Sequence, residues 1–293
     1  MPVNFIKDAI FDHLTKIDYK VQTIENPNTK GILKETLLSG DKCNIKLLSE
    51  REFEVKIPEN IYHEIIATDF FFSLQKVKEQ SRFLTSKALD NTPISWAIVS
   101  AYYSAFYSAV ELSKLFGIYN LYLKKEHCNS ILSHADGGNK LDRGNYIGMV
   151  NSDALDYITI RFSASKNVPP HDLAWKNMLK IIEFNNVNDL RDSKVAVYKL
   201  VKGVLDTSGA YIQTPNNVRN DWNYSFANAY DSTFCNDISN VKTYLKSTSA
   251  LSIMSWPSQY RRMTKKENDV FSVIYIEAIL RQSMLDLNSR LLK

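Results

Sequence analysis

The chain has 293 residues, enough for one large domain or two ordinary ones at ~150 residues each. Hydrophobic residues make up 44% and charged residues 23%, a balance that excludes a disordered or low-complexity protein. The formal net charge of +4 is too small to indicate nucleic-acid binding by itself. Only 9 glycines occur, without a G-x-G-x-x-G or Walker sequence, whereas 16 Tyr, 14 Phe and 4 Trp favour helices packed through aromatic rings.

The cysteines and the apolar segments of the sequence indicate the cellular compartment in which the protein is expected. Cys43, Cys128 and Cys235 are odd in number and far apart, so they predict neither a disulfide framework nor a four-thiolate zinc site. We expect a reduced, cytoplasmic protein. Residues 1–14 carry charged side chains where a signal peptide would be apolar. Residues 91–110 carry no charge, but their serines and tyrosines favour a helix buried in protein over a membrane span.

Residues 1–60 predict a small N-terminal unit that contains short strands. A helix is expected at 5–17, followed by β-prone runs at 32–38, 44–48 and 52–57. Because these runs are too few and too short for an independent sheet, we expect them to pack against a helical body.

Residues 61–293 predict a helical domain, which makes the fold class mainly α. A long irregular insertion is expected at about 118–185, where glycines cluster, with a short strand at 157–162 and a helix starting near His171. Helical periodicity and capping residues predict helices at 68–89, 94–116, 190–208, from Thr214-Pro215 through Tyr224, and at about 266–292.

The predicted helix at 94–116 is expected to be central. Read at every fourth residue, it has a row of alanines and a row of serines beside rows of larger residues, one of which is Tyr103, Tyr107 and Glu111. Rows at this spacing are the ridges and grooves of helix packing. The small rows therefore predict close approach of neighbouring helices, and the aromatic rows predict interlocking rings.

Two stretches together resemble the HEPN superfamily of helical-bundle domains. The run Ser95–Ala109 (SWAIVSAYYSAFYSA) is similar to the family's alanine- and tyrosine-rich second helix, and Arg219–Tyr224 (RNDWNY) falls at the start of a later helix, where the family has R-N-x-x-x-H. The resemblance implies a HEPN-like bundle and a metal-independent endoribonuclease without cofactor. It implies RNA as substrate, a homodimer, and a toxin or effector role in antiviral defence or a toxin–antitoxin system, with a cognate antitoxin or other defence protein as a further partner.

The same resemblance implies roles for four residues. Arg219 would bind the scissile phosphate, while Asn220, Asn223 and Tyr224 would position the substrate. Tyr224 stands where the family has histidine. Tyrosine ordinarily ionises near pH ~10 and is a poor base at neutral pH. The alternative is therefore a catalytically inactive scaffold or sensor that binds RNA, a nucleotide or a protein.

The residues around Arg219 also allow two interpretations without any family. Arg219 and Asn223 lie four apart near a helix N-terminus, a position that attracts phosphate. Alternatively, Arg219 forms a surface salt bridge with Asp221 or Asp231. Trp222 and Val218 are expected on a separate, apolar face.

Glu111 and His171 are auxiliary candidates for this site. Glu111 could pair with Arg219 from a neighbouring helix and orient it, or reach water at a helix end. His171 is the best donor of the missing general base if the insertion folds over Arg219, although capping or packing also explains it.

Two further clusters carry chemistry-bearing residues. Arg261, Arg262, Lys265 and Lys266 lie beside Trp256 and Tyr260, a mixture that can hold single-stranded RNA or simply form a solvated loop. His127, Cys128 and His134 suggest a metal site. Zinc normally takes four ligands, and no second cluster with suitable spacing exists, so we expect no metal.

Overall fold

The computed structural model describes residues 4–24, 27–154, 156–165, 168–184, 192–206, 212–224, 240–247 and 250–292. These residues form a mainly α protein with one antiparallel sheet. The helices are α1 (Phe5–Lys16), α2 (Leu33–Ser39), α3 (Glu59–Thr85), α4 (Ile94–Leu115), α5 (Lys125–Leu132), α6 (Pro170–Glu183), α7 (Asp192–Leu205), α8 (Pro215–Tyr224), α11 (Val241–Ser247), α12 (Ala250–Tyr260) and α13 (Lys265–Leu291), with short 3-10 turns at Thr29–Gly31 and Lys87–Asn91. The strands are β1 (Asn44–Ser49), β2 (Glu52–Pro58), β3 (Ile118–Leu123), β4 (Gly144–Ala154) and β5 (Tyr157–Ala164).

The chain divides into two compact units, each built from separate segments. A helical unit comprises residues 1–9, 74–109 and 175–285, and a sheet unit comprises residues 10–73, 110–174 and 286–293. The sheet unit contains residues 10–60 of the predicted N-terminal unit and residues 118–174 of the predicted insertion.

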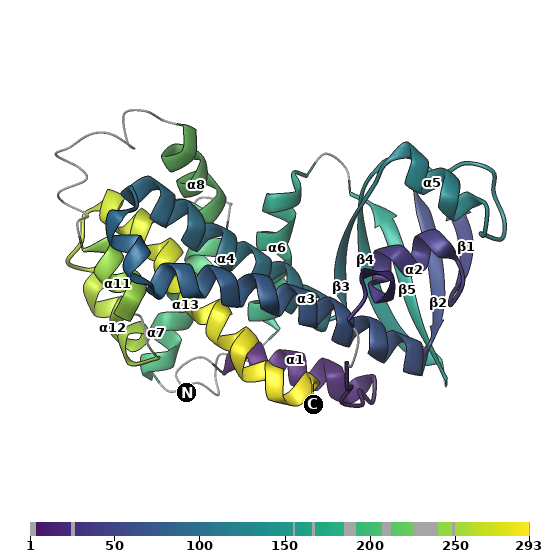
Figure 1. Cartoon of the computed structure of the whole chain (residues 1–293), viewed down its shortest axis with the longest axis horizontal. Coiled ribbons are helices and arrows are strands. Elements are labelled where there is room, and N and C mark those ends of the chain that lie inside the picture. Colours follow the sequence, from purple (N-terminus) through teal and green to yellow (C-terminus); the bar gives the residue numbers. More distant parts are fainter. Residues whose placement is uncertain are drawn as a thin grey trace. The chain divides into compact units, whose positions relative to one another are not determined.

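The sheet unit contains five strands in the order β1-β2-β5-β4-β3 (Figure 1). Every adjacent pair is antiparallel, and β2 pairs with β5 from Glu52 opposite Ser163 to Pro58 opposite Tyr157. The β-prone runs near the N-terminus and the supposedly irregular insertion thus belong to one sheet. The N-terminal pair of strands is joined to the rest of the sheet through the pairing of β2 with β5.

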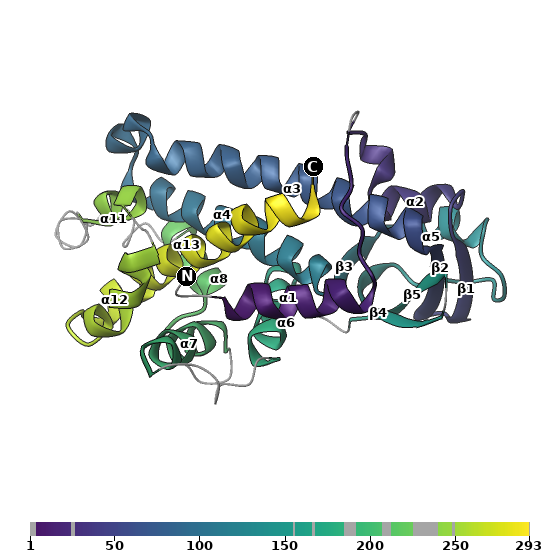
Figure 2. The same cartoon turned by 90° about the horizontal axis from the view of Figure 1, so that it is seen from below.

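One face of this sheet is apolar and packs inward. Phe53 of β2 and Phe162 of β5 are fully buried and stack with 4.8 Å between ring centroids. Gly148 of β4 lies opposite Phe162, and a Cβ atom there would come within 2.5 Å of the Phe162 ring. Figures 1 and 2 both place α2 and the first half of α3 on the same side of the sheet.

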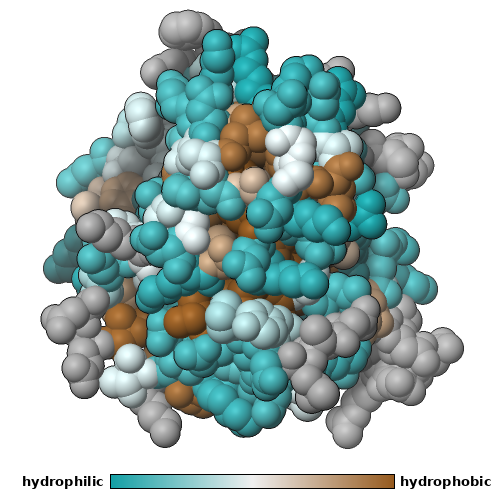
Figure 3. Space-filling view, turned by 90° about the vertical axis from the view of Figure 1, so that its right-hand side faces the viewer, coloured by the Kyte–Doolittle hydropathy of each residue, from teal (hydrophilic) through white to brown (hydrophobic). Residues whose placement is uncertain are grey.

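The other face of the sheet is largely polar. Lys46, Glu54 and Arg161 are neighbours across β1, β2 and β5, so opposite charges alternate across the strands. In Figure 3, hydrophobic residues appear as separate areas between hydrophilic ones on the side of the molecule that it shows.

The segment 32–38 was predicted to be a strand, but that prediction is wrong. Residues Leu33–Ser39 form α2, which ends at Gly40 with a left-handed φ of 70°. The Gly40 amide donates to the Thr36 carbonyl, a common way to close a helix. The apolar residues of this run therefore follow a helical period rather than an alternating one.

The helical unit is a bundle that includes parts of α3, α4 and α13, and Figure 2 shows these three long helices running alongside one another. The predicted helix at 94–116 is confirmed as α4. Its alanine row is buried, as are Ser104 and Ser108. The Ser104 hydroxyl donates to the Glu277 carboxylate of α13 at 2.8 Å, and Arg281 donates to the same oxygen. Close approach of α4 and α13 is thus accompanied by a buried polar contact.

The other predicted helices are observed with shifted boundaries. The helix predicted at 68–89 begins earlier, at Glu59, and ends at Thr85. The end predicted at Ser208-Gly209 for the helix α7 lies outside the described residues. None of the helices in the described ranges is both long and apolar enough to cross a membrane.

Candidate anion-binding site

The helix that carries Arg219 begins as the sequence predicts. Pro215 is the first residue of α8, and the Thr214 hydroxyl accepts a hydrogen bond from the Asn217 amide at 3.4 Å. Val218 and Trp222 are buried, which fixes the rotation of the helix. Arg219 consequently lies on a half-exposed face between the buried side and solvent.

Two neutral side chains hold the Arg219 guanidinium group. Its Nη1 donates to the Asn220 Oδ1 atom at 2.7 Å, and its Nη2 donates to the Tyr103 hydroxyl of α4 at 2.7 Å. The guanidinium carbon lies 5.6 Å from the centroid of the Tyr103 ring and 5.3 Å from that of Tyr224. The group is therefore flanked by two aromatic rings, within the range of cation–π attraction.

The charge of Arg219 is not neutralised by a carboxylate within the described part of the chain. The predicted alternative, a salt bridge to Asp221, is not formed, and Asp231 lies outside the described residues. Partial burial disfavours the charged form, but the hydrogen bond to Tyr103 and the nearby tyrosines raise the pKa of Arg219 above its ordinary value. The Nε atom is buried and has no hydrogen-bond partner among the described residues.

The aromatic row of α4 continues from this group. The Tyr107 ring centroid lies 6.1 Å from that of Tyr103, and the Lys76 ammonium of α3 lies 5.6 Å from the Tyr107 centroid. Sequence reasoning assigned Tyr103 and Tyr107 to helix packing and missed them as site residues. Their spacing of one helical turn was visible in the sequence, but the sequence did not show that Arg219 of another helix lies beside them.

Asn223 and Tyr224 complete the predicted motif at the end of α8. Tyr224 is 68% exposed, and Asn223 is also exposed. Among the predicted positioning residues, Asn220 and Tyr224 contact Arg219 directly. Asn223 lies four residues after Arg219, the spacing expected for one helix face. The hydrogen bonds of the Arg219 guanidinium group, however, go to Asn220 and Tyr103.

Glu111 and Arg219 were predicted to pair with each other, but each has other partners. Glu111 is fully buried and accepts a hydrogen bond from Ser73 at 2.7 Å, while the Lys114 ammonium lies 3.1 Å from its carboxylate. Lys114 also bonds to Asp69 at 2.9 Å. Glu111 therefore belongs to a buried charge cluster of the sheet unit, and it does not orient Arg219.

Burial and neighbouring charges act in opposite directions in this cluster. Burial raises the pKa of the Glu111 carboxyl above its ordinary value, and nearby Lys114 partly offsets that rise. Burial also works against the Lys114 charge, but the carboxylates of Asp69 and Glu111 outweigh it and raise the pKa of Lys114. One cation thus compensates two carboxylates.

The histidines do not supply a base for Arg219 within its own unit. His171 lies in the first turn of α6 and is half-buried. It belongs to the sheet unit, as do the other four histidines of the chain, whereas Arg219 belongs to the helical unit. The role of His171 as a substitute base therefore stays a prediction.

The predicted basic cluster surrounds the start of α13. Arg261, Arg262, Lys265 and Lys266 are all exposed. Thr264 caps the helix, exchanging hydrogen bonds with Glu267, so the positive end of the helix dipole adds to the four charges. Trp256, however, is fully buried and stacks on Tyr275 with 4.9 Å between centroids, so it offers no ring to a nucleobase.

His127, Cys128 and His134, the three residues that suggested a metal site, have other contacts. The His127 Nδ1 atom accepts from the Lys124 amide at the start of α5, and the buried Cys128 thiol donates to the Asp142 carbonyl. His134 follows α5 and packs against Gly40. No group of three or more potential metal ligands occurs among the described residues.

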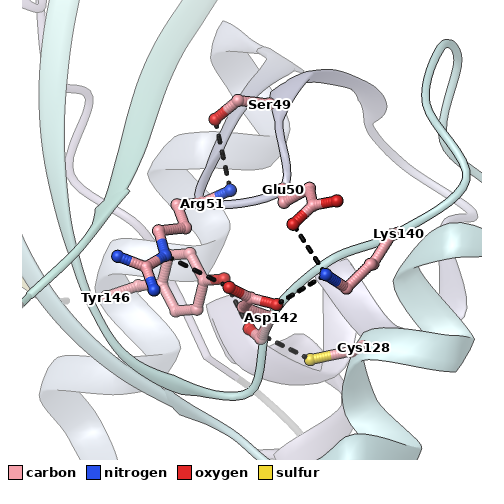
Figure 4. Close-up of polar contacts among 7 residues, drawn as sticks. All are labelled: Ser49, Glu50, Arg51, Cys128, Lys140, Asp142 and Tyr146. Atoms are coloured by element: carbon pink, nitrogen blue, oxygen red, sulfur yellow. Dashed lines mark hydrogen bonds and ion pairs between the residues drawn. The ribbon is translucent and has the colours of Figure 1, made fainter.

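A second polar cluster, drawn in Figure 4, holds a loop onto the sheet. Asp142 lies between Arg51, at 3.1 Å from its carboxylate, and Lys140, at 3.6 Å, while Lys140 also contacts Glu50 at 2.7 Å. The hydrogen bond from Arg51 lowers the pKa of Asp142 below its ordinary value. Since two cations compensate two carboxylates here, the cluster leaves no charge for a ligand.

The chain has no significant match to protein-family models, to curated proteins or to solved structures. Its function is therefore inferred from its own residues.

Proposed function

We propose that the chain is a HEPN-like, metal-independent endoribonuclease in which Arg219 binds the scissile phosphate. One observation carries the proposal: Arg219 is a half-buried cation whose hydrogen-bond partners are the neutral Asn220 and Tyr103. A guanidinium group that has no carboxylate partner keeps its full attraction for an anion. Its planar set of N–H donors matches the oxygens of a phosphate group. The resemblance of Ser95–Ala109 and Arg219–Tyr224 to the HEPN pattern makes RNA phosphate the anion.

The chemistry of this site follows from charge. In cleavage without metal, the 2′-hydroxyl loses its proton to water and attacks the adjacent phosphorus, while the bond from phosphorus to the 5′-oxygen of the next nucleotide breaks and that oxygen takes a proton from water. The products are a 2′,3′-cyclic phosphate and a 5′-hydroxyl, and negative charge accumulates on the phosphate oxygens in the transition state. Arg219 stabilises that charge, while Tyr103 and Asn220 hold the guanidinium in place before substrate binds. Tyr224 and Asn223, both exposed at the end of the same helix, contact the nucleotide.

The proposal extends to assembly and biological role. Two protomers pair so that two Arg219 sites lie in one cleft, and the protein acts as a toxin or effector in antiviral defence or a toxin–antitoxin system, held inactive by a cognate antitoxin or another defence protein. The exposed cations Arg261, Arg262, Lys265 and Lys266 hold more distant RNA phosphates. Light scattering on the purified protein tests the dimer.

Cleavage of RNA in the presence of EDTA tests the activity. Wild-type protein is expected to cut a mixed cellular RNA, and Arg219→Ala is expected to lower the rate at least ~10²-fold, because one positioned charge-stabilising donor contributes that much. Arg219→Lys keeps the positive charge but lacks the planar set of N–H donors, so it should recover only part of the cleavage rate. Cleavage that survives Arg219→Ala, or that requires a metal ion, would contradict the proposal.

A second candidate function is RNA binding without cleavage. It is favoured by the absence of histidine from the sequence of the helical unit and by Tyr224 at the position where the family has its histidine. In that case wild-type protein binds RNA in an Arg219-dependent manner but leaves it intact. Tyr224→His is the informative variant here, because a restored imidazole should then produce cleavage that wild type lacks.

A further inference from the structure

We propose that Tyr103, Tyr107 and Lys76 extend the Arg219 site into a subsite for single-stranded RNA, in which a nucleobase stacks on the tyrosine rings and a neighbouring phosphate binds Lys76. These three residues are called the tyrosine row. The inference rests on the proposed function, since it assigns the strand beyond the phosphate held by Arg219.

The row and Arg219 form a pair of rings with a cation at each end. Arg219 lies 5.6 Å from the Tyr103 centroid, Tyr107 follows at 6.1 Å, and Lys76 lies 5.6 Å from the Tyr107 centroid. All of these residues belong to the helical unit. A pair of rings with a cation at each end combines stacking surfaces for bases with charges for the neighbouring phosphates, the two elements from which single-strand binding sites are built.

The exposure of the row distinguishes it from ordinary core packing. Tyr102, the immediate neighbour of Tyr103 on α4, is fully buried and packs on Trp175 with 5.9 Å between centroids. Tyr103 and Tyr107 are only half-buried, and Lys76 is exposed. The same helix therefore uses one tyrosine for its core and leaves two others partly exposed.

The charge of the row also favours a polyanion. Lys76 is absent from the ion pairs formed between described residues, as is Arg219, whereas Lys114, Lys140 and Lys246 each have a carboxylate within 3.1 Å. Cations that lie over rings rather than beside carboxylates retain their attraction for phosphate.

A single strand is favoured over a duplex because of the rings. Bases in an A-form helix are stacked on one another, and their faces are inaccessible to side chains. Only unpaired bases present a face to Tyr107. The row therefore predicts a preference for unpaired RNA that a purely electrostatic site would not show.

Binding to a labelled 2′-O-methyl RNA strand, which lacks the attacking hydroxyl, tests the row without cleavage. Tyr107→Ala is expected to weaken binding ~5–100-fold, because stacking contributes about 1–3 kcal/mol per base. Tyr107→Phe keeps the ring and should bind within about 2-fold of wild type. Lys76→Gln should weaken binding and make the slope of log affinity against log salt shallower by about 0.7.

Tyr122→Ala is the matched control, because Tyr122 is 53% exposed but lies on β3 of the sheet unit. It is expected to leave affinity unchanged, and thermal melting of each variant verifies folding. A duplex of the same sequence should bind at least several-fold more weakly than the strand. Unchanged affinity in Tyr107→Ala, or equal binding of strand and duplex, would overturn the inference.

The outcomes separate this inference from the proposed function. Arg219-dependent cleavage with unaltered binding by Tyr107→Ala would remove the tyrosine row and leave the nuclease. Strand binding that depends on Tyr107, without any cleavage of unmodified RNA, would support the row and favour the binding function over catalysis.

Discussion

Arg219 and Lys114 are both partly buried cations, and they differ in what surrounds them. Lys114 lies between Asp69 and Glu111, whose carboxylates are 2.9 Å and 3.1 Å away. Arg219 lies between Tyr103, Asn220 and Tyr224, which carry no formal charge. The first group balances its own charge inside the fold, whereas the second leaves a positive charge available at the surface.

This difference separates a stabilising role from a binding role. A buried cation that compensates carboxylates cannot be removed without exposing their charges to a poorly solvated environment. A cation held by neutral groups costs little to remove, because its partners keep other hydrogen-bonding options at the surface. Stability should therefore depend on Lys114, and RNA affinity on Arg219.

The largest expected effect comes from Lys114→Met. With the cation removed, Glu111 and Asp69 remain as buried carboxylates, and the free energy of unfolding should fall by ~3–5 kcal/mol. Urea denaturation measures the change. Lys140→Ala, which breaks only exposed ion pairs, is the control and should cost no more than ~1 kcal/mol. Equal losses in the two variants would contradict the comparison.

The pH dependence of the stability of Lys114→Met tests whether buried charge causes its loss of stability. The folded protein binds a proton to Glu111 more readily than the unfolded chain does, because burial raises the pKa of this carboxyl. Stability from such a group falls as pH rises. The deficit of Lys114→Met relative to wild type should therefore shrink on acidification from about pH 8 to about pH 5. A deficit independent of pH would show that lost packing, not charge, causes it.

A smaller effect is expected at the Arg219 site from Tyr103→Phe. The ring remains, but the hydrogen bond to the guanidinium Nη2 is lost. RNA affinity should fall ~3–10-fold, corresponding to about 0.5–1.5 kcal/mol for one hydrogen bond. Fluorescence anisotropy measures it. Unchanged affinity would show that Tyr103 does not position Arg219.

The smallest expected effect is that of Arg219→Gln on stability. Because Arg219 compensates no carboxylate among the described residues, its replacement should change the free energy of unfolding by less than ~1 kcal/mol while abolishing most RNA binding. A loss comparable with that of Lys114→Met would mean that Arg219 holds the bundle together instead of binding a ligand.

Much of the helical unit could be predicted from sequence because its signals are local. Pro93 precedes α4, and the cap Thr214 with Pro215 opens α8, so both helices begin where expected. The rows of α4 follow from spacing alone. Spacing within one helix does not show which residues of other helices lie beside it. It predicted the row that contains Tyr103, but not the contact of Tyr103 with Arg219, which is 116 positions away.

The sheet was harder to predict because its signals are not local. The glycines near 137–148 suggested an irregular insertion, yet Gly148 lies inside β4, where the Phe162 ring occupies the space of a side chain. The run before Gly40 was predicted to be a strand, but it is a helix that ends at Gly40. Each glycine is explained by a contact or a backbone conformation that a single sequence does not reveal.

The pairing of β2 with β5 also has a consequence for how the protein folds. The contact between Glu52 and Arg161 closes a loop of 109 positions that contains α3 and α4. An isolated hairpin such as β1–β2 is marginally stable in water. Because β5 is synthesised well after this hairpin, the sheet unit is expected to form slowly. The edge of β2 that pairs with β5 is exposed until then.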